Sequence, residues 1–174
     1  MSKLYFAKSK PDAKIPTKRL EDAGYDLYAC SDVDEIEILP NKIKMIDTGI
    51  HSAFDSDYAM VIKERGSTGT KGMSVRCGVV DSGYRNEIKV IINNTSHRTI
   101  ILSKDTEKTK SELLKGMSDT TYVDTNYTIY PMSKAIAQAV MLKVPNLETE
   151  EISLEDLRLI ESERGDGLLD STNK

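Results

Sequence analysis

The sequence contains no tryptophan and only two phenylalanines, and aromatic residues make up just 6% of its 174 residues. Aliphatic side chains and methionine must therefore fill the core. Cysteine is also rare: Cys30 and Cys77 stand among apolar residues, and neither belongs to a Cys-x-x-Cys pair. This pattern predicts two buried free thiols in a reducing compartment, with a single disulfide as the alternative. The two histidines are isolated, so the sequence indicates no zinc site.

Long apolar runs are missing as well. No stretch is long enough to span a bilayer, and the first residues lack the apolar segment of a secretory signal. The net charge of −4 argues against a general nucleic-acid or membrane binder. With 39% hydrophobic and 30% charged residues, the composition is that of a soluble globular protein. We therefore expect a cytoplasmic protein.

The chain is rich in short β-branched segments separated by turn residues, which predicts a mostly-β domain. The central segment is residues 88–92, a predicted buried strand. It follows residues 78–85, which read Gly-Val-Val-Asp-Ser-Gly-Tyr-Arg. Turn chemistry at 81–83 predicts an element that projects the Asp81 carboxylate and the Tyr84 ring from a rigid scaffold. A surface hairpin with a solvated aspartate is the alternative for this stretch alone.

Two earlier segments carry polar side chains beside predicted strands. Residues 22–29 alternate from Tyr25 onward, so Asp26 faces away from the apolar side. Residues 64–72 contain three glycines, three hydroxyl side chains and Arg65. Glycine lets backbone N–H groups approach an anion, and arginine binds phosphate oxygens with two hydrogen bonds. This loop is therefore a candidate phosphate site, although most such loops are simply flexible.

Residues 88–93 and 98–102 form a predicted hairpin. Residues 103–126 are polar and lack the strand pattern of the segments before them, which indicates an insertion with a short helix at 111–117. The strand-like rhythm resumes after this segment.

The last part of the chain contains a predicted core strand at residues 135–144, with Gln138 as its polar exception. This glutamine is either a buried amide that hydrogen-bonds backbone groups or an amide that belongs to a functional site. Ser153, followed three residues later by an acid, predicts the start of a short helix that runs to Ile160. The glycine-containing tail, residues 163–174, is predicted to be a mobile arm.

Five segments, in this order, resemble the five motifs of the trimeric dUTPases, the deoxyuridine triphosphate nucleotidohydrolases, and the chain looks like a phage or Gram-positive bacterial member. The segments span nearly the whole chain and comprise residues 22–29, 64–72, 78–85, 133–138 and 164–173. The resemblance implies an all-β fold, a distorted jelly-roll barrel of the β-clip type with a short helix and a flexible C-terminal arm. Residues 1–162 would form one domain, including an insertion at 103–126, and residues 163–174 would close over the active site.

The resemblance also implies a reaction and a role for each matching residue. dUTP would be hydrolysed to dUMP and pyrophosphate, with Asp81 as the base that activates water for attack on the α-phosphorus. Asp26 would hold Mg²⁺ through water. Leu169 replaces a stacking phenylalanine and would cover the base by apolar contact. The other residues assigned to substrate binding are Arg65, Gly66, Ser67, Gly78, Val79, Val80, Tyr84, Lys89, Gln138, Arg164 and Ser171.

Two alternatives remain open, one because another enzyme class has the same fold and one because the chain departs from the family pattern. The fourth motif lacks its arginine, and the fifth carries Asp170 near the expected phosphates. A dCTP deaminase, or a bifunctional deaminase and dUTPase, has the same fold and would use an acid near Glu87. A regulatory binding module is the other alternative, with a protein partner docked on residues 103–126. For the hydrolase, the resemblance implies a homotrimer with each site built from three subunits, and deletion of 103–126 should leave hydrolysis largely intact.

Overall fold

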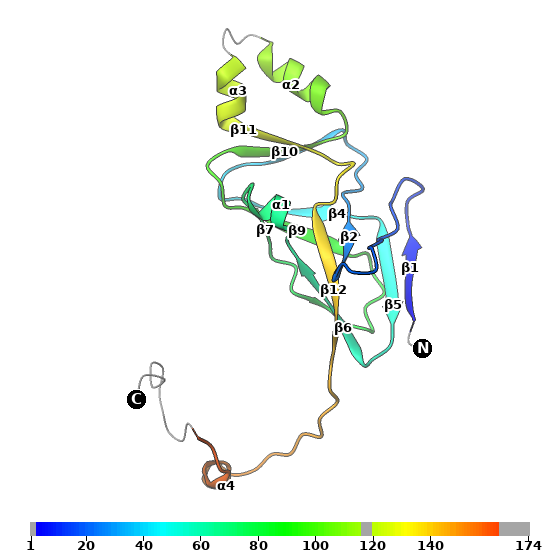
Figure 1. The fold of residues 1–174 in the computed structure, drawn as a ribbon, viewed down its shortest axis with the longest axis vertical. Coiled ribbons are helices and arrows are strands. Elements are labelled where there is room, and N and C mark those ends of the chain that lie inside the picture. The colour runs from blue at the N-terminus through cyan, green and yellow to red at the C-terminus, as the bar shows by residue number, and fades with distance from the viewer. Residues whose placement is uncertain (1–2, 116–119, 164–174) are drawn as a thin grey trace. The chain divides into compact units, whose positions relative to one another are not determined.

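The computed structural model of the chain describes residues 3–115 and 120–163. The chain divides into two compact units, Met1–Val144 and Pro145–Lys174. Strands make up most elements of the first unit (Figure 1), so the all-β prediction is confirmed. In the described part of the chain, no helix is both long enough and apolar enough to cross a membrane.

Backbone hydrogen bonds group the described strands into four small sheets. The largest contains, in spatial order, β2 (Gly24–Leu27), β12 (Ala137–Lys143), β6 (Tyr58–Lys63) and β8 (Val79–Val80). A second sheet contains β4 (Ile43–Asp47), β9 (Lys89–Asn94) and β7 (Met73–Val75). A third contains β11 (Tyr127–Pro131), β10 (Thr99–Ser103) and β3 (Glu35–Ile38). The fourth pairs β1 (Leu4–Lys8) with β5 (Ile50–Phe54).

The core consists mainly of aliphatic side chains and methionine, as the shortage of aromatic residues predicts. Every second residue of β9 is buried, namely Val90, Ile92 and Asn94. Ile91 points to the other face, where it pairs with Met45 of β4 and lines a surface pocket. Apolar and polar residues alternate poorly in β9 because its outward face also carries an apolar residue, Ile91, which lies beside Met45 at the pocket.

The predicted hairpin of residues 88–93 and 98–102 is wrong. Its two strands exist, but β9 pairs with β4 and β7, whereas β10 pairs with β3 and β11. Strands β3 and β4 also lie in different sheets. The chain therefore changes sheet twice at the same corner, once between β3 and β4 and once between β9 and β10.

Asn94 holds this corner together from a fully buried position. Its side-chain amide donates hydrogen bonds to the carbonyls of Ile38 (2.8 Å) and Arg98 (2.7 Å). Its backbone carbonyl accepts a hydrogen bond from the Asn41 N–H at 2.8 Å. Asn41 has a φ of 58°, a left-handed conformation that asparagine tolerates better than most residues. Ile38 and Asn41 are more than fifty residues from Asn94 in sequence, so the turn residues predict a turn but not the change of sheet.

The described part of residues 103–126 contains two helices, α2 (Thr106–Leu114) and α3 (Thr120–Asn126), rather than one short helix at 111–117. Helix α2 begins earlier than predicted because Asp105 caps it and accepts a hydrogen bond from the Lys108 N–H at 3.0 Å. The helices join β10 to β11, and these two strands pair in parallel. Since parallel neighbours need a crossover connection, this segment is that crossover.

The described part of the second unit contains α4 (Leu154–Leu159). The predicted cap is confirmed, because the Ser153 hydroxyl accepts a hydrogen bond from the Asp156 N–H at 3.0 Å. Two acids in the first turn and Arg158 in the last complement the helix dipole.

Candidate active site

The predicted site residues that the structure describes fall into two groups along the sheet of β2, β12, β6 and β8, and Lys89 joins the first of them from β9. One group surrounds a pocket beside β8 and the turn that follows it. The other lies on β2, on β12 and in the loop after β6. Arg164, Leu169 and Ser171 lie outside the described residues.

The pocket has a volume of about 250 Å³, and Asp81, Tyr84 and Lys89 line it together with aliphatic side chains. Strand β8 is an edge strand, so part of its backbone N–H and C=O groups have no neighbouring strand to pair with. Gly78, directly before β8, has a φ of +67°, a conformation that residues with side chains rarely adopt. The pocket therefore offers apolar walls beside backbone donors and acceptors.

A tight turn presents Asp81 and Tyr84 at this pocket. The Tyr84 N–H donates to the Asp81 carbonyl at 3.0 Å, and the Tyr84 hydroxyl donates to the Glu87 carbonyl at 3.1 Å. The Arg85 guanidinium donates to the carbonyl of Ser82. Asp81 is exposed, and no described residue hydrogen-bonds or pairs with its carboxylate. The turn is thus fixed while the carboxylate stays free to bind water.

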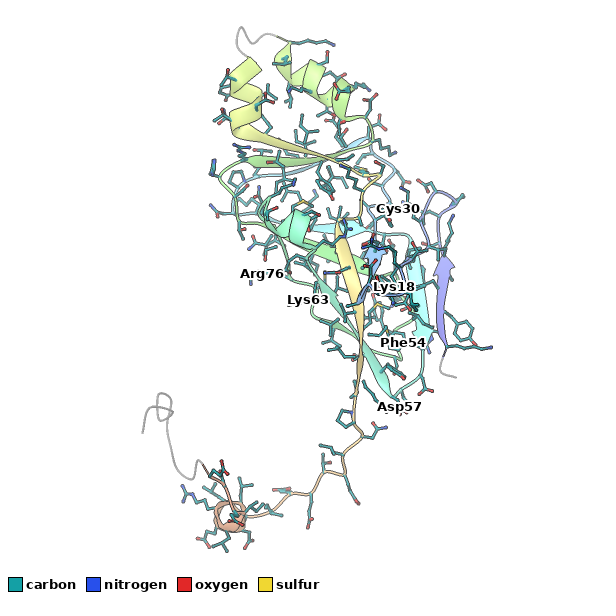
Figure 2. The ribbon with its side chains drawn as sticks, viewed as in Figure 1. Lys18, Cys30, Phe54, Asp57, Lys63 and Arg76 are labelled. Carbon is teal, nitrogen blue, oxygen red and sulfur yellow. The ribbon has the colours of Figure 1, made fainter. Side chains whose placement is uncertain are left out.

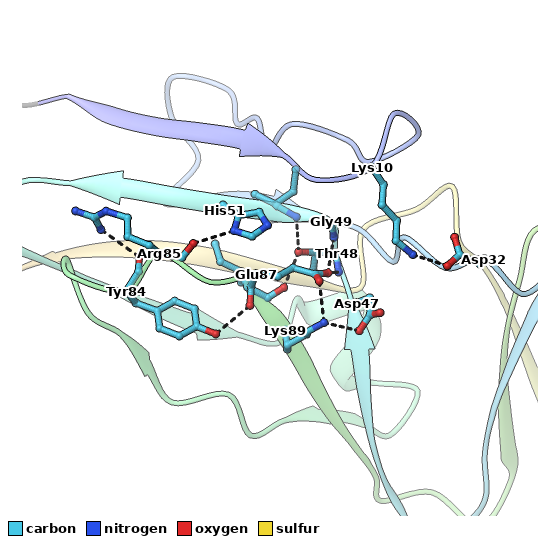
Figure 3. Close-up of polar contacts among 12 residues, drawn as sticks. Lys10, Asp32, Asp47, Thr48, Gly49, His51, Tyr84, Arg85, Glu87 and Lys89 are labelled. Atoms are coloured by element: carbon cyan, nitrogen blue, oxygen red, sulfur yellow. Dashed lines mark hydrogen bonds and ion pairs between the residues drawn. The ribbon is translucent and has the colours of Figure 1, made fainter.

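Glu87 anchors the end of the turn to the start of β5 (Figure 3). Its carboxylate accepts hydrogen bonds from the N–H groups of Thr48 (2.9 Å) and Gly49 (2.7 Å) and from Lys89 Nζ (2.8 Å). Lys89 Nζ also lies 2.8 Å from Asp47 Oδ1. Burial raises the pKa of Glu87, but the hydrogen bonds from Lys89 and Gly49 outweigh burial and lower it, and Asp47 and Glu87 raise the pKa of Lys89. Both groups are therefore held in their charged forms.

The second group is centred on Gln138, which lies directly opposite Asp26 in the β12–β2 register. Arg65 Nε lies 2.9 Å from Asp26 Oδ1, and about a third of each side chain is exposed. Gln138 Nε2 donates to the Glu64 carbonyl at 3.0 Å. A Cβ atom on Gly24 would lie 2.7 Å from Gln138 Oε1, so only glycine permits this approach. The structure thus brings together Asp26, Arg65 and Gln138.

The glycine-rich loop after β6 is more regular than the sequence predicts. Residues Gly66–Gly69 form a single helical turn, α1. Thr68 is fully buried, and its hydroxyl accepts from the Arg65 N–H (3.1 Å) and donates to the Arg65 carbonyl (3.0 Å). Gly66 and Ser67 remain exposed beside it. A buried threonine therefore fixes the backbone that carries Arg65.

Within one chain, the two groups are well separated. Strand β8 pairs with the middle of β6, so Asp81 follows at the level of Ala59, whereas Gln138 lies opposite Lys63. The stretch between these levels is about 13 Å long at roughly 3.3 Å per residue. Asp81 therefore lies towards one end of β6, and the loop that carries Arg65 lies at the other.

Cys77 is a pocket residue that the sequence did not point to. Both cysteines are free thiols, as predicted, but only Cys30 is buried, and Cys77 lines the pocket. Its Sγ accepts a hydrogen bond from the Ile91 N–H at 2.9 Å, and burial raises the pKa of its thiol. Because the thiolate is the reactive form, Cys77 is part of the pocket wall rather than a nucleophile.

Comparison with known proteins connects this fold and these residues with one family. The dUTPase family model matches residues 11–107. The deoxyuridine 5′-triphosphate nucleotidohydrolase of Nautilia profundicola is 29% identical over 176 residues and is covered, like this chain, to 99%. The protein of the same name from Candida albicans is 30% identical over 166 residues, which are 94% of this chain and 84% of the relative.

Solved structures with the same fold include two viral dUTPases. The Staphylococcus bacteriophage 80alpha dUTPase with dUpNHpp superimposes with a TM-score of 0.70 at 17% identity, over 99% of both chains. The EIAV dUTPase gives a TM-score of 0.61 at 20% identity, over 87% of this chain and 98% of that one. The fold is thus that of an all-β nucleotidohydrolase.

The chain belongs to the dUTPase family, because the family model covers more than half of it and a relative is 30% identical over most of both lengths. This confirms the resemblance drawn from the ordered motifs. It also confirms the expected class of enzyme, a dUTP diphosphatase.

Proposed function

We propose that the protein hydrolyses dUTP to dUMP and pyrophosphate with Asp81 as the base that activates water for attack on the α-phosphorus. The observation that carries this proposal is the Asp81 carboxylate, which is exposed, has no partner among the described residues and lies at the pocket. A general base needs this freedom to bind the water whose proton it takes. Neighbouring hydrogen bonds fix the turn and so limit the directions in which the carboxylate can point.

The pocket suits the deoxyuridine part of the substrate. Uracil presents one N–H between two carbonyl groups, and those backbone groups of Gly78, Val79 and Val80 that do not bond to β6 can match such an edge. Cytosine reverses one donor and one acceptor, which would leave groups unpaired at about 1–3 kcal/mol each. The Tyr84 ring lies against the sugar in this proposal and leaves no room for a 2′-hydroxyl.

Asp26, Arg65 and Gln138, with Gly66 and Ser67, are proposed to bind the triphosphate and its Mg²⁺. Asp26 fits a water-mediated magnesium contact, since its carboxylate is partly exposed and Mg²⁺ keeps most of its waters and takes further ligands from phosphates. When bound, the ion would neutralise charge on the phosphates. Arg65 can turn from Asp26 to phosphate oxygens, which a guanidinium binds in pairs.

A site shared between subunits is supported by the separation of the two groups. Asp81 and Arg65 must reach the same nucleotide, yet the stretch of β6 between their levels is at least about 13 Å long. If the pocket of one copy faces the Arg65 loop of another, both groups reach one substrate. Val79 and Leu142, which are 57% and 49% exposed on this sheet, would be covered by such contact. We therefore propose the homotrimer that the resemblance implies.

The C-terminal arm is proposed to complete the site on the resemblance alone. Arg164 would bind the γ-phosphate, Leu169 would cover the base, and Ser171 would contact the substrate. Since Leu169 cannot stack as an aromatic ring does, the closed arm would hold the nucleotide less tightly than a phenylalanine-bearing one.

The deaminase alternative requires a free acid–base group near Glu87, and the contacts of Glu87 disfavour it. Two backbone N–H groups and Lys89 hold its carboxylate, and Glu87 is not among the residues that line the pocket. We assign Glu87 to fixing the pocket wall. Lys89 lines the pocket, but its amino group is already paired with Asp47 and Glu87. Its predicted substrate contact would therefore be made by the aliphatic part of the side chain.

The test is pyrophosphate release from dUTP in the presence of Mg²⁺. We expect Asp81→Asn to lower kcat by roughly 10²–10⁴-fold, the usual size of general-base help. Asp57→Asn changes another exposed turn aspartate and should leave kcat unchanged. Absence of dUTP turnover by the wild type would overturn the proposal and favour a binding module, and ammonia release from dCTP would favour the deaminase.

A further inference from the structure

A lysine extends the row of side chains that contains Asp26 and Gln138. Gln138 lies opposite Asp26 of β2 on one side and opposite Lys63 of β6 on the other. Directly opposite residues of antiparallel strands project from the same face of a sheet. The burial of Met60 and Ile62, which alternate with Lys63 along β6, places Lys63 on the outer face. Figure 2 shows Lys63 beside β12.

The charge of Lys63 is uncommitted. Its side chain is exposed, and no described residue makes a hydrogen bond or ion pair with its amino group. The other cation of this group, Arg65, is paired with Asp26, so that pair is neutral. Glu64, the acid next to Lys63, has its Cγ 3.6 Å from the position of a Cβ on Gly69, so the stem of its side chain lies against the α1 turn.

We propose that Lys63 is an additional substrate-binding residue, which contacts the pyrophosphate end of dUTP. This inference rests on the proposed function, because it takes the row of Asp26 and Gln138 as the triphosphate site. Adjacent strands are about 4.8 Å apart, so the side chains of Gln138 and Lys63 start one strand spacing apart, and the long lysine side chain can reach a phosphate bound by Gln138. The lysine carries its compact charge on a flexible four-carbon stem with three donors, which suits phosphate oxygens that move during the reaction.

The experiment compares Lys63→Met with wild type in dUTP hydrolysis. We expect KM for dUTP to rise about tenfold, the size of one lost charge-assisted hydrogen bond, with kcat changed little. The inhibition constant for pyrophosphate should rise by the same factor, whereas that for deoxyuridine should stay the same. Lys63→Arg should restore most of the affinity for dUTP and pyrophosphate.

Lys44→Met is the matched control, because Lys44 is also an exposed strand lysine but lies in the sheet of β4. Both variants should unfold at the wild-type temperature. If the wild type hydrolyses dUTP and Lys63→Met has unchanged constants for dUTP and pyrophosphate, the role of Lys63 is overturned while the proposed function stands. If the deoxyuridine constant rises equally, the effect is not on the phosphates and the inference is also overturned. Absence of turnover by the wild type overturns both.

Discussion

Glu87 illustrates, at the scale of single residues, how a carboxylate can organise a site without touching substrate. It ties the end of the Asp81 turn to the Thr48 and Gly49 backbone and to Lys89. Its side chain is only 18% exposed, so water replaces these partners poorly. Loss of this anchor would free the turn that carries the proposed base.

The contacts of Glu87 predict a pH-dependent contribution to stability. Its pKa in the folded protein lies below the ordinary 4.5, so the contribution is present above that value and is lost as the pH falls through the lowered pKa. We expect Glu87→Gln to reduce the free energy of unfolding at pH 7 by roughly 1–3 kcal/mol. The difference from wild type should shrink below pH 4.5 in urea titrations across pH.

Glu37→Gln serves as the control for this measurement, since Glu37 is an exposed strand glutamate whose carboxylate has no partner among the described residues. It should change the unfolding free energy little at any pH. A Glu87→Gln difference that persists unchanged at low pH would mean that packing, rather than the charge of Glu87, is responsible.

At the scale of elements, the α2–α3 segment is both a crossover and the proposed insertion. Ser103 belongs to β10 and is buried, and its hydroxyl lies 2.8 Å from that of Thr109 in α2. Deleting all of 103–126 would therefore remove a strand residue. The parallel register pairs Thr99 with Tyr127 and Ser103 with Pro131, so any shorter connection must return along the full strand, about 17 Å.

A deletion that respects this topology replaces residues 106–126 with a glycine–serine linker of about ten residues, which spans roughly 17 Å. No predicted site residue lies on α2 or α3, so kcat and KM for dUTP should stay within about threefold of wild type. The melting temperature should fall, because Val123 of α3 is buried and its contacts are lost. A folded deletion variant without activity would make these helices part of the site, and lost binding of a regulatory protein would identify them as its docking surface.

At the scale of the whole molecule, the distance between Asp81 and Arg65 predicts complementation between inactive variants. Asp81→Asn and Arg65→Gln should each be inactive alone. In a trimer that takes these residues from different subunits, co-refolding equal amounts should restore about a quarter of the wild-type activity, because that share of sites receives both intact residues.

Size-exclusion chromatography with light scattering supplies the control, since each refolded sample should have three times the 19.4 kDa chain mass. Circular dichroism checks that both variants refold. Mixed trimers without recovered activity would show that one chain supplies both residues, and a monomeric wild type would remove the basis for a shared site.

Much of the site was predictable because its motifs are short and local. Asp81 and Tyr84 begin and end a recognisable turn, and Ser153 caps its helix as the sequence predicts. The hairpin across residues 94–97 failed because local turn residues cannot tell which strands a segment pairs with. Lys63 went unnoticed because only the register with Gln138 gives it neighbours of interest.

The sequence by itself determined the family, the all-β class and most strand positions, since side-chain preferences and motif order act over a few neighbouring residues. Only the tertiary structure decided that β9 and β10 enter different sheets and that Glu87 bonds backbone some forty residues away. It also decided that Asp81 and Arg65 belong to opposite ends of β6. Such pairings depend on buried hydrogen bonds between distant segments, which no local pattern encodes.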